Sequence, residues 1–188
     1  IFLTSIFYTI NSFAAEEELT ITAKNNEQGY KKAYFAGGCF WCMEESFDKV
    51  KGVIKSISGY SGGHVKNPTY RQVIYEKTGH VEAIEVTYNP KLTNYEKLLE
   101  VFWNNIDPFD AIGQFCDKGE SYRSVAFYQN KIQKKFIEKT AKNIENRFKN
   151  KKVVTLIWEF KKFYPAEDYH QDYYQNNFLR YLAYKSGC

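Results

Sequence analysis

Residues 32–50 read KAYFAGGCFWCMEESFDKV and join a strand pattern to a helix pattern through two glycines. The apolar run 32–36 predicts a short buried strand, and Gly37-Gly38 predicts a turn. From residue 39 to residue 50 the apolar positions favour a helix. This order puts Cys39 at a helix N-terminus, where free N–H groups and the helix dipole favour a thiolate. The stretch therefore predicts a reactive thiol, with a buried and inert cysteine as the alternative.

The rest of the chain alternates between strand and helix patterns. Strands are expected at 53–60, 81–88, 123–128 and 153–160, and helices at 93–104, 130–150 and 165–174. A capping box from Thr93 to Glu96 starts the first of these helices. Strands and helices mix without a strict βαβ order, which predicts the α+β class, a sheet with helices packed on it. Function is expected in the long loops 61–80 and 105–121.

Length and composition indicate one folded domain. The chain has 188 residues, of which 44% are hydrophobic, and this is enough to bury a sizeable core. The formal charge of +4 is only mildly basic. Lysines gather between residues 131 and 162, but apolar side chains repeat there at helical spacing, namely Ile132, Phe136, Ile137, Ile144 and Phe148. A solvated helix face explains the lysines, so no nucleic-acid partner is expected.

The N-terminal segment differs from the rest in composition. It opens IFLTSIFYTINSFAAEEE, which is similar to the apolar part of a truncated secretory signal that ends at a small-residue site around Phe13-Ala14-Ala15. The apolar run is too short to span a bilayer. We expect a signal-like segment and polar linker at 1–28, a single domain at 29–188, and no membrane span in the mature form. A periplasmic or secreted location is expected, with a cytoplasmic one as the alternative.

Glu82 is a candidate proton donor. It shares one face of its strand with the apolar side chains of Ile84, Val86 and Tyr88. Burial without a paired base raises the pKa of a carboxyl group, which then stays protonated at neutral pH and can donate a proton. The alternative is a solvated glutamate at the strand end, or an ion pair with a lysine.

Tyr70, Tyr122 and Asp117 are further candidates, because all three fall in or beside the long loops. A phenol can donate a hydrogen bond that polarises an oxygen atom. A structural role is the alternative for each of the three.

Several motifs together resemble one known family. They are Gly38-Cys39-Phe40-Trp41, Gly59-Tyr60-Ser61-Gly62-Gly63, Asn67-Pro68-Thr69-Tyr70, Gly79-His80-Val81-Glu82, Asp117 with Gly119, Ser121-Tyr122-Arg123-Ser124 and Ala166-Glu167-Asp168-Tyr169-His170-Gln171. In this order they resemble the A-type peptide methionine sulfoxide reductases over about residues 32–184. The resemblance implies a two-layer α/β sandwich, a ferredoxin-like plait with a mixed sheet, which agrees with the α+β class.

The resemblance also implies a role for each reactive group. Cys39 corresponds to the nucleophile that attacks the sulfoxide sulfur, and Glu82 to the acid that protonates the sulfoxide oxygen. Tyr70 and Tyr122 correspond to hydrogen-bond donors to that oxygen. A sulfoxide is a poor electrophile until its oxygen is protonated, so a thiolate and a neutral carboxylic acid must coexist near pH 7.

For the substrate, the resemblance implies methionine S-sulfoxide, held by an apolar wall of Phe40 and Trp41 around its ε-methyl group. Asp117 corresponds to an anchor near the substrate's backbone amide. The products are methionine and a sulfenic acid on Cys39. A second thiol then forms a disulfide, which a thioredoxin-like reductant releases. The domain at 29–188 is thus expected to be a monomeric catalytic reductase for protein repair, without metal or organic cofactor.

The cysteines leave the resolving thiol open. Cys39, Cys42, Cys116 and Cys188 are too few for a disulfide scaffold in a chain of this length, so chemistry is their expected use. Cys188 ranks first, because a flexible tail after Ser186-Gly187 could swing into the site. Cys42 lies one helical turn from Cys39 on the same face, and Cys116 lies in the loop expected to border the site. An external thiol ranks last.

Other interpretations of the C-x-x-C at residues 39–42 stay open. A thioredoxin-like oxidoreductase also carries this motif at a helix N-terminus, although Phe40-Trp41 is bulky there and no proline stands convincingly opposite the site. A zinc site would need a second C-x-x-C or a close histidine pair. The remaining candidates lack that spacing, namely Cys116, Cys188, His64, His80 and His170. A non-enzymatic module that binds peptides or sugars is the third alternative. His170 is expected to pack near the site and to be hydrogen-bonded.

Overall fold

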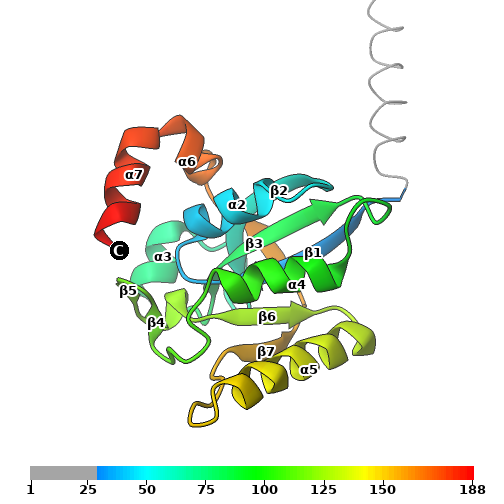
Figure 1. Ribbon diagram of the computed structural model, residues 1–188. Coiled ribbons are helices and arrows are strands. Elements are labelled where there is room, and N and C mark those ends of the chain that lie inside the picture. Colours follow the sequence, from blue (N-terminus) through cyan, green and yellow to red (C-terminus); the bar gives the residue numbers. More distant parts are fainter. Residues whose placement is uncertain (1–28) are drawn as a thin grey trace, which may run out of the picture. The chain divides into compact units, whose positions relative to one another are not determined.

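The computed structural model describes residues 29–188 and shows a mixed sheet with helices packed on it (Figure 1). Within these residues the six-stranded sheet has the order β7-β6-β1-β3-β2-β8. Its strands are β1 (Lys31–Ala36), β2 (Val53–Ser61), β3 (Val81–Tyr88), β6 (Val125–Tyr128), β7 (Leu156–Glu159) and β8 (Phe163–Pro165). β6 and β7 are parallel, whereas β2 pairs antiparallel with both β3 and β8. The mixed sheet confirms the α+β class.

The helices connect and cover these strands. They are α2 (Phe40–Asp48), α3 (Tyr70–Tyr75), α4 (Tyr95–Asn104), α5 (Lys131–Arg147), α6 (Tyr173–Asn176) and α7 (Phe178–Gly187). In Figure 1, α4 and α5 run along the sheet, while α6 and α7 form the C-terminal end above α2 and α3. The short strands β4 (Gly113–Gln114) and β5 (Asp117–Lys118) form a separate hairpin in the loop after α4.

Successive side chains of β1 alternate between the two faces of the sheet, and the helices α2 and α4 cover the face that carries Phe35. The Phe35 ring packs on Phe47 of α2 and Phe102 of α4, at centroid distances of 5.1 and 5.2 Å. All three rings are fully buried, and each contributes roughly 1.5–3 kcal/mol by leaving water. Tyr34 and Ala36 belong to a second apolar cluster with other strand residues, because successive side chains of a strand point to opposite faces.

Local side-chain hydrogen bonds move some element boundaries away from the predicted ones. Asn94, not Thr93, caps α4, because the Asn94 side chain accepts the backbone N–H of Lys97 at 2.9 Å. Residues 165–174 do not form the predicted helix. β8 ends at Pro165, and a 3-10 turn covers residues 168–170. The chain then bends at Asp172, whose φ is +51°, before α6 begins.

The C-terminal tail also differs from the prediction. Ser186 and Gly187 belong to the last turn of α7 and not to a flexible tail. The side chains of Tyr181 and Lys185 both donate to the Glu45 carboxylate of α2, Tyr181 at 2.5 Å. This contact fixes α7 against the helix that carries Cys39 and Cys42.

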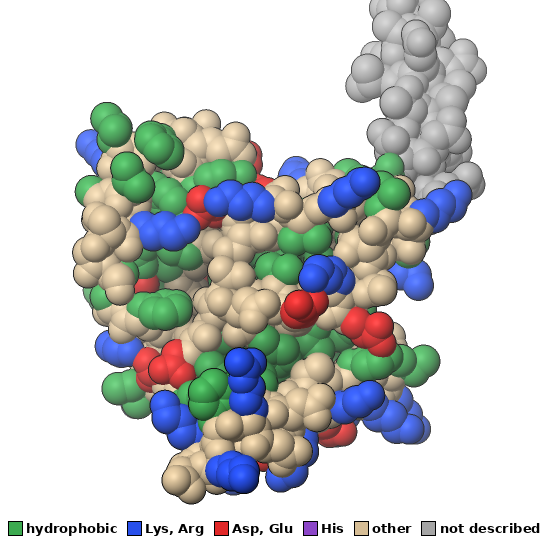
Figure 2. Space-filling view, viewed as in Figure 1, with side chains coloured by type: hydrophobic (Ala, Val, Ile, Leu, Met, Phe, Trp, Pro, Cys, Tyr) green, Lys and Arg blue, Asp and Glu red, His purple; other side chains and the backbone are tan. Residues whose placement is uncertain are grey.

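The lysines of α5 agree with a solvated helix face. Asn130 caps this helix by accepting the N–H groups of Ile132 and Gln133, and Ile137 is its fully buried apolar contact with the core. On the face shown in Figure 2, Lys and Arg side chains are spread among other residue types. No helix within residues 29–188 has both the length and the apolar character that a membrane crossing needs. The signal-like segment predicted at 1–28 lies outside the described residues, so its export function stays a prediction.

Candidate active site

The turn before α2 places Cys39 at the start of that helix. Gly38 has φ +80°, a conformation that favours glycine, and a Cβ atom there would lie 2.6 Å from the Gln114 side chain. Gln114 is in turn fixed by Asp107: its carboxamide accepts the Asp107 N–H at 2.7 Å and donates to the Asp107 carbonyl at 3.0 Å. The loop after α4 therefore packs against Gly38, the residue that precedes Cys39.

Glu82 lies on β3 at the same helix start. Its Oε2 accepts the backbone N–H of Phe40 at 3.0 Å, and its side chain is almost fully buried. Burial raises the pKa of Glu82 to about 8, although the Phe40 hydrogen bond opposes the change. The carboxyl group is therefore neutral near pH 7, the state that a proton donor requires.

Tyr70 and Tyr122 lie near Glu82 and come from two separate segments of the chain. Tyr70 is the first residue of α3, which Thr69 and Gln72 start with a capping box. Tyr122 ends a 3-10 turn after the β4–β5 hairpin. Burial and the nearby Glu82 raise the pKa of Tyr70 to about 12, and the same causes raise the pKa of Tyr122. Both phenols keep their protons and can donate hydrogen bonds.

The free cysteines of residues 29–188 are Cys39 and Cys42. Burial raises the pKa of the Cys39 thiol, and the adjacent Cys42 thiol and Glu82 carboxyl raise it further. Contact with Cys39 lowers the pKa of Cys42, and Tyr181 and Lys185 add to this effect. In this state the pKa of Cys42 is lowered and that of Cys39 is raised, and the thiolate predicted at Cys39 stays a prediction. Cys39 is only 9% exposed, and the first helical N–H group is donated to Glu82.

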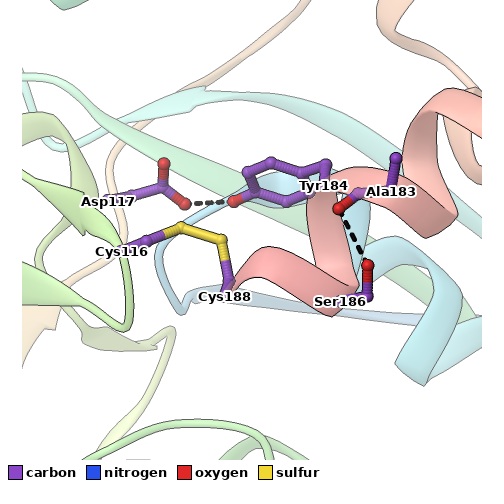
Figure 3. Close-up of a disulfide and its surroundings, with 6 residues drawn as sticks. All are labelled: Cys116, Asp117, Ala183, Tyr184, Ser186 and Cys188. Atoms are coloured by element: carbon purple, nitrogen blue, oxygen red, sulfur yellow. Dashed lines mark hydrogen bonds between the residues drawn. A yellow bond between two sulfur atoms is a disulfide. The ribbon is translucent and has the colours of Figure 1, made fainter.

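Asp117 and Tyr184 of α7 line the same cavity as the two free thiols, and Figure 3 shows both residues next to the Cys116–Cys188 disulfide. The Tyr184 hydroxyl of α7 donates to Asp117 Oδ2 and also lies beside Cys39. A disulfide joins Cys116 to Cys188, with the two Cα atoms 5.3 Å apart. Cys188 and Cys116 are therefore paired with each other and are not free to attack Cys39 as thiols in this state.

Tyr184 is a site residue that the sequence analysis missed. A signal was available, because Tyr181, Tyr184 and Cys188 are spaced to lie on one face of a helix. No helix is predicted from the sequence after residue 174, so the helical spacing of these residues, which lie on or next to α7, is not considered there.

A cavity of about 270 Å³ opens onto both free thiols. Its lining includes Cys39, Cys42, Phe115, Asp117 and Tyr184. This volume is close to the lower end for ligand pockets. Phe40 is buried beneath the site, whereas Trp41 is half-buried and stacks on Tyr173 of α6 at a centroid distance of 3.8 Å.

The predicted site residues come from five parts of the chain, and of these Cys39, Cys42 and Asp117 line the cavity. Cys39, Phe40, Trp41 and Cys42 come from the start of α2; Tyr70, Glu82, Asp117 and Tyr122 come from α3, β3, β5 and the following turn. Within residues 29–188 no cluster of three or more His, Cys, Asp or Glu side chains is arranged to hold a metal ion. Two adjacent free thiols, a buried neutral carboxylic acid and phenols that can donate hydrogen bonds are the groups that a thiol-dependent oxidoreductase needs.

Comparison with known proteins identifies the family. A family model described as "Peptide methionine sulfoxide reductase" matches residues 31–188. The chain is 51% identical over 161 residues to "Peptide methionine sulfoxide reductase MsrA" of a Listeria monocytogenes strain, covering 85% of this chain and 90% of the relative. It is also 51% identical over 157 residues to "Peptide methionine sulfoxide reductase MsrA 2" of Staphylococcus aureus, covering 82% and 88%. The chain belongs to the peptide methionine sulfoxide reductase family.

Solved structures agree with this assignment. Mxr1 from Saccharomyces cerevisiae in reduced form is 30% identical, with a TM-score of 0.74 over 80% of this chain and 87% of that chain. Methionine sulfoxide reductase A of Corynebacterium diphtheriae is 28% identical, with a TM-score of 0.73 over 80% and 76%. The predicted fold class and oxidoreductase activity, the reduction of methionine sulfoxide by thiol chemistry, are therefore confirmed. The thioredoxin-like, zinc-site and binding-module interpretations are set aside.

Proposed function

We propose that the chain reduces the S-epimer of methionine sulfoxide, free or in peptides, with Cys39 as nucleophile and Glu82 as acid. The observation that carries this assignment is the hydrogen bond from the Phe40 N–H to Glu82 Oε2, 3.0 Å long. It holds a neutral carboxylic acid beside the residue that bears the thiol. A sulfoxide placed between the two groups would meet a proton donor at its oxygen and a nucleophile at its sulfur.

In the first step, sulfur of Cys39 bonds to the sulfoxide sulfur while Glu82 gives its proton to the sulfoxide oxygen. Tyr70 and Tyr122 donate hydrogen bonds to that oxygen as charge develops on it. The proton lost from Cys39 replaces the one that Glu82 gave. The S–O bond then breaks and the oxygen passes to Cys39, which yields methionine and a sulfenic acid on Cys39.

For the second step, the geometry favours Cys42 as the resolving thiol. Cys42 is free, contacts Cys39, and has a lowered pKa, so it supplies the thiolate that attacks a sulfenic acid. The attack forms a Cys39–Cys42 disulfide and releases water. The first rank that the sequence gave Cys188 stays untested; in this state Cys188 is bonded to Cys116, and it would have to be reduced before it could resolve Cys39.

The proposal also assigns the residues that contact the substrate and the class of the reductant. Phe40 and Trp41 form the wall around the substrate methyl group, and Asp117 anchors its backbone amide. A thioredoxin-like dithiol reduces the disulfide. In support, a solved structure of Mxr1 from Saccharomyces cerevisiae is a complex with Trx2.

Export to the periplasm is also part of the proposal, together with action as a monomer on oxidised proteins there. The signal-like composition of residues 1–15 supports export. Cell fractionation of the tagged full-length gene product tests the location, and sedimentation tests the oligomeric state.

A single turnover without reductant tests the chemistry. Reduced protein is mixed separately with the S- and the R-epimer of a methionine sulfoxide peptide, and methionine is quantified before cysteine states are mapped by mass spectrometry. About one methionine per chain from the S-epimer alone, with Cys39 oxidised, is expected. Equal product from both epimers, or product from a Cys39→Ser variant, would contradict the assignment.

A further inference from the structure

The indole of Trp41 is hydrogen-bonded to His170 across a sequence separation of 129 residues. Trp41 Nε1–H donates to His170 Nδ1 at 3.2 Å. Nδ1 therefore carries a lone pair, and a neutral ring must hold its proton on Nε2. Burial lowers the pKa of His170, although Glu167 opposes this change, so the imidazole is neutral near pH 7 and keeps its acceptor.

The same imidazole packs against further residues of the proposed site. Its ring centroid is 4.9 Å from that of Phe40 and 4.5 Å from that of Tyr70. The His170 side chain is only 3% exposed, and its Nε2 has no hydrogen-bond partner within residues 29–188. Leaving one polar atom of a buried ring unpaired costs free energy. Within residues 29–188 the only hydrogen bond of the imidazole ring is therefore the one that it accepts from Trp41.

His170 is itself held firmly. Its backbone N–H donates to the Glu167 carbonyl at 2.9 Å. The Glu167 carboxylate accepts the Tyr60 hydroxyl and the Tyr70 N–H, each at 2.8 Å. On the other side, the Gln171 carboxamide bonds to the N–H and the carbonyl of Ser58 on β2, at 3.0 and 2.9 Å. The imidazole is thus fixed to the sheet and to α3, and its position is set independently of Trp41.

We propose that His170 is a positioning residue that fixes the Trp41 indole by accepting its N–H, and thereby sets the size of the pocket for the substrate's methyl group. The inference rests on the proposed role of Trp41 as a wall of that pocket. Tyr173 supports one face of the Trp41 indole by stacking. The hydrogen bond to His170 fixes the direction in which the indole N–H points, and therefore the orientation of the whole ring. Without the bond the indole could turn, and the pocket would discriminate less sharply between alkyl groups.

The test compares two substitutions at His170. His170→Phe keeps an aromatic ring but removes the acceptor, whereas the side-chain oxygen of His170→Asn can take the place of Nδ1. Single-turnover reduction of a peptide methionine S-sulfoxide is measured against substrate concentration, together with the corresponding ethyl sulfoxide. In His170→Phe we expect the half-saturating concentration for the methyl substrate to rise about tenfold, with a smaller change in maximal rate. The preference for methyl over ethyl should fall, and His170→Asn should recover most of both effects.

A double-mutant cycle tests whether His170 acts through Trp41. Trp41→Phe keeps an aromatic wall and removes the donor, so His170→Phe should add little in that background. His64→Phe, the same change at an exposed histidine, is the matched control and should leave both measurements unchanged. A full additional effect of His170→Phe on Trp41→Phe would overturn the proposal, as would an Asn variant as impaired as the Phe variant.

A measurement on the unaltered protein keeps the proposal testable if a variant fails to fold. The ¹⁵N spectrum of the His170 ring should show protonated Nε2 and unprotonated Nδ1 near pH 7. The Trp41 indole proton should exchange slowly with D₂O; Trp41→Phe identifies its signal. A proton on Nδ1, or rapid exchange of the indole proton, would overturn the proposal. Failure of the proposed function is a different result, namely no methionine formed by the unaltered protein from the S-epimer.

Discussion

Glu82 Oε2 accepts the backbone N–H of Phe40 at 3.0 Å, so the buried acid is bonded to the residue that directly follows Cys39. The hydrogen-bond donor at the start of α2 thus serves the acid and not the thiol. Burial outweighs this bond and raises the pKa of Glu82 to about 8. The relationship explains how a neutral acid is kept beside a cysteine, and it leads to the first two predictions.

Glu82→Gln should abolish proton donation while preserving the acceptor for the Phe40 N–H. We expect the single-turnover rate to fall by roughly 10²–10⁴-fold, the usual contribution of a general acid, with little change in folding. Glu85→Gln is the matched control, because Glu85 lies on the same strand and bonds to Tyr34 and Lys32, away from the thiols. An unchanged rate in Glu82→Gln, or an equal loss in Glu85→Gln, would contradict the acid role.

The reductase step should lose rate as pH rises through about 8, the pKa of Glu82. The acid acts in its protonated form, so its contribution is complete below this pKa and falls about tenfold per pH unit above it. Tyr70 does not produce this loss, because its pKa is raised to about 12. Single-turnover rates between pH 6 and 10 give the profile. The decline should be absent from the residual rate of Glu82→Gln; a decline that persists there would assign it to another group.

Glu44 should make the protein less stable as pH rises. This carboxyl on α2 is fully buried and lacks a hydrogen-bond partner within residues 29–188. Burial raises its pKa to about 8 and the Asp172 and Asp48 carboxylates add to the change, whereas the Asp172 backbone and the Ser58 hydroxyl oppose it. In the unfolded chain the group loses its proton near pH 4.5, whereas the folded state keeps it up to about pH 8. Folding therefore binds a proton in this window, and the free energy of unfolding decreases across it, by a few kcal/mol in order of magnitude.

Urea unfolding of the wild type and of Glu44→Gln at pH 5 and pH 9 measures this effect. Gln has a similar size and no charge, so the variant should lose less stability between the two pH values. Glu82, whose pKa is also raised to about 8, contributes equally to the pH dependence of stability in both proteins, so the difference between them reports on Glu44. Glu138→Gln serves as the control, because Glu138 is an exposed residue of α5 whose ion pair with Lys134 spans 3.9 Å. Equal losses in wild type and Glu44→Gln would show that Glu44 does not hold its proton in the folded state.

The local parts of the site could be predicted from the sequence. The pattern at residues 32–50 predicted a strand, a glycine turn and a helix, and β1 and α2 follow it. The apolar partners of Glu82 on β3 predicted its burial correctly. Both inferences depend only on side chains a few residues apart, where periodicity decides the outcome.

Contacts between distant segments could not be predicted in this way. The disulfide joins Cys116 and Cys188 across 72 residues, and the Trp41–His170 bond spans 129. Each depends on how the segment after β8 packs over α2. The hydrogen bonds of Glu167 and Gln171 to α3 and β2 determine that packing. In the same segment β8 ends at Pro165, residues 168–170 form a 3-10 turn and Asp172 has a φ of +51°, so residues 165–174 do not continue as one helix. The pKa values of Cys39 and Cys42 likewise depend on burial and on contacts with α7, which helix position alone does not reveal, so the thiolate at Cys39 stays a prediction.

Separate cysteine variants should distinguish a resolving role from a structural one. In a single turnover with the Cys116–Cys188 disulfide intact, we expect methionine together with a Cys39–Cys42 disulfide. Cys42→Ser should still release about one methionine but leave a sulfenic acid on Cys39 that a sulfenic-acid-specific reagent labels. Cys188→Ser should still form the Cys39–Cys42 disulfide, while its free energy of unfolding falls by up to about 4 kcal/mol, the chain-entropy value for a loop of 72 residues. If instead Cys188→Ser accumulates the sulfenic acid and Cys42→Ser does not, Cys188 is the resolving thiol, and the Cys116–Cys188 bond must open during each cycle because its sulfur is then required at Cys39.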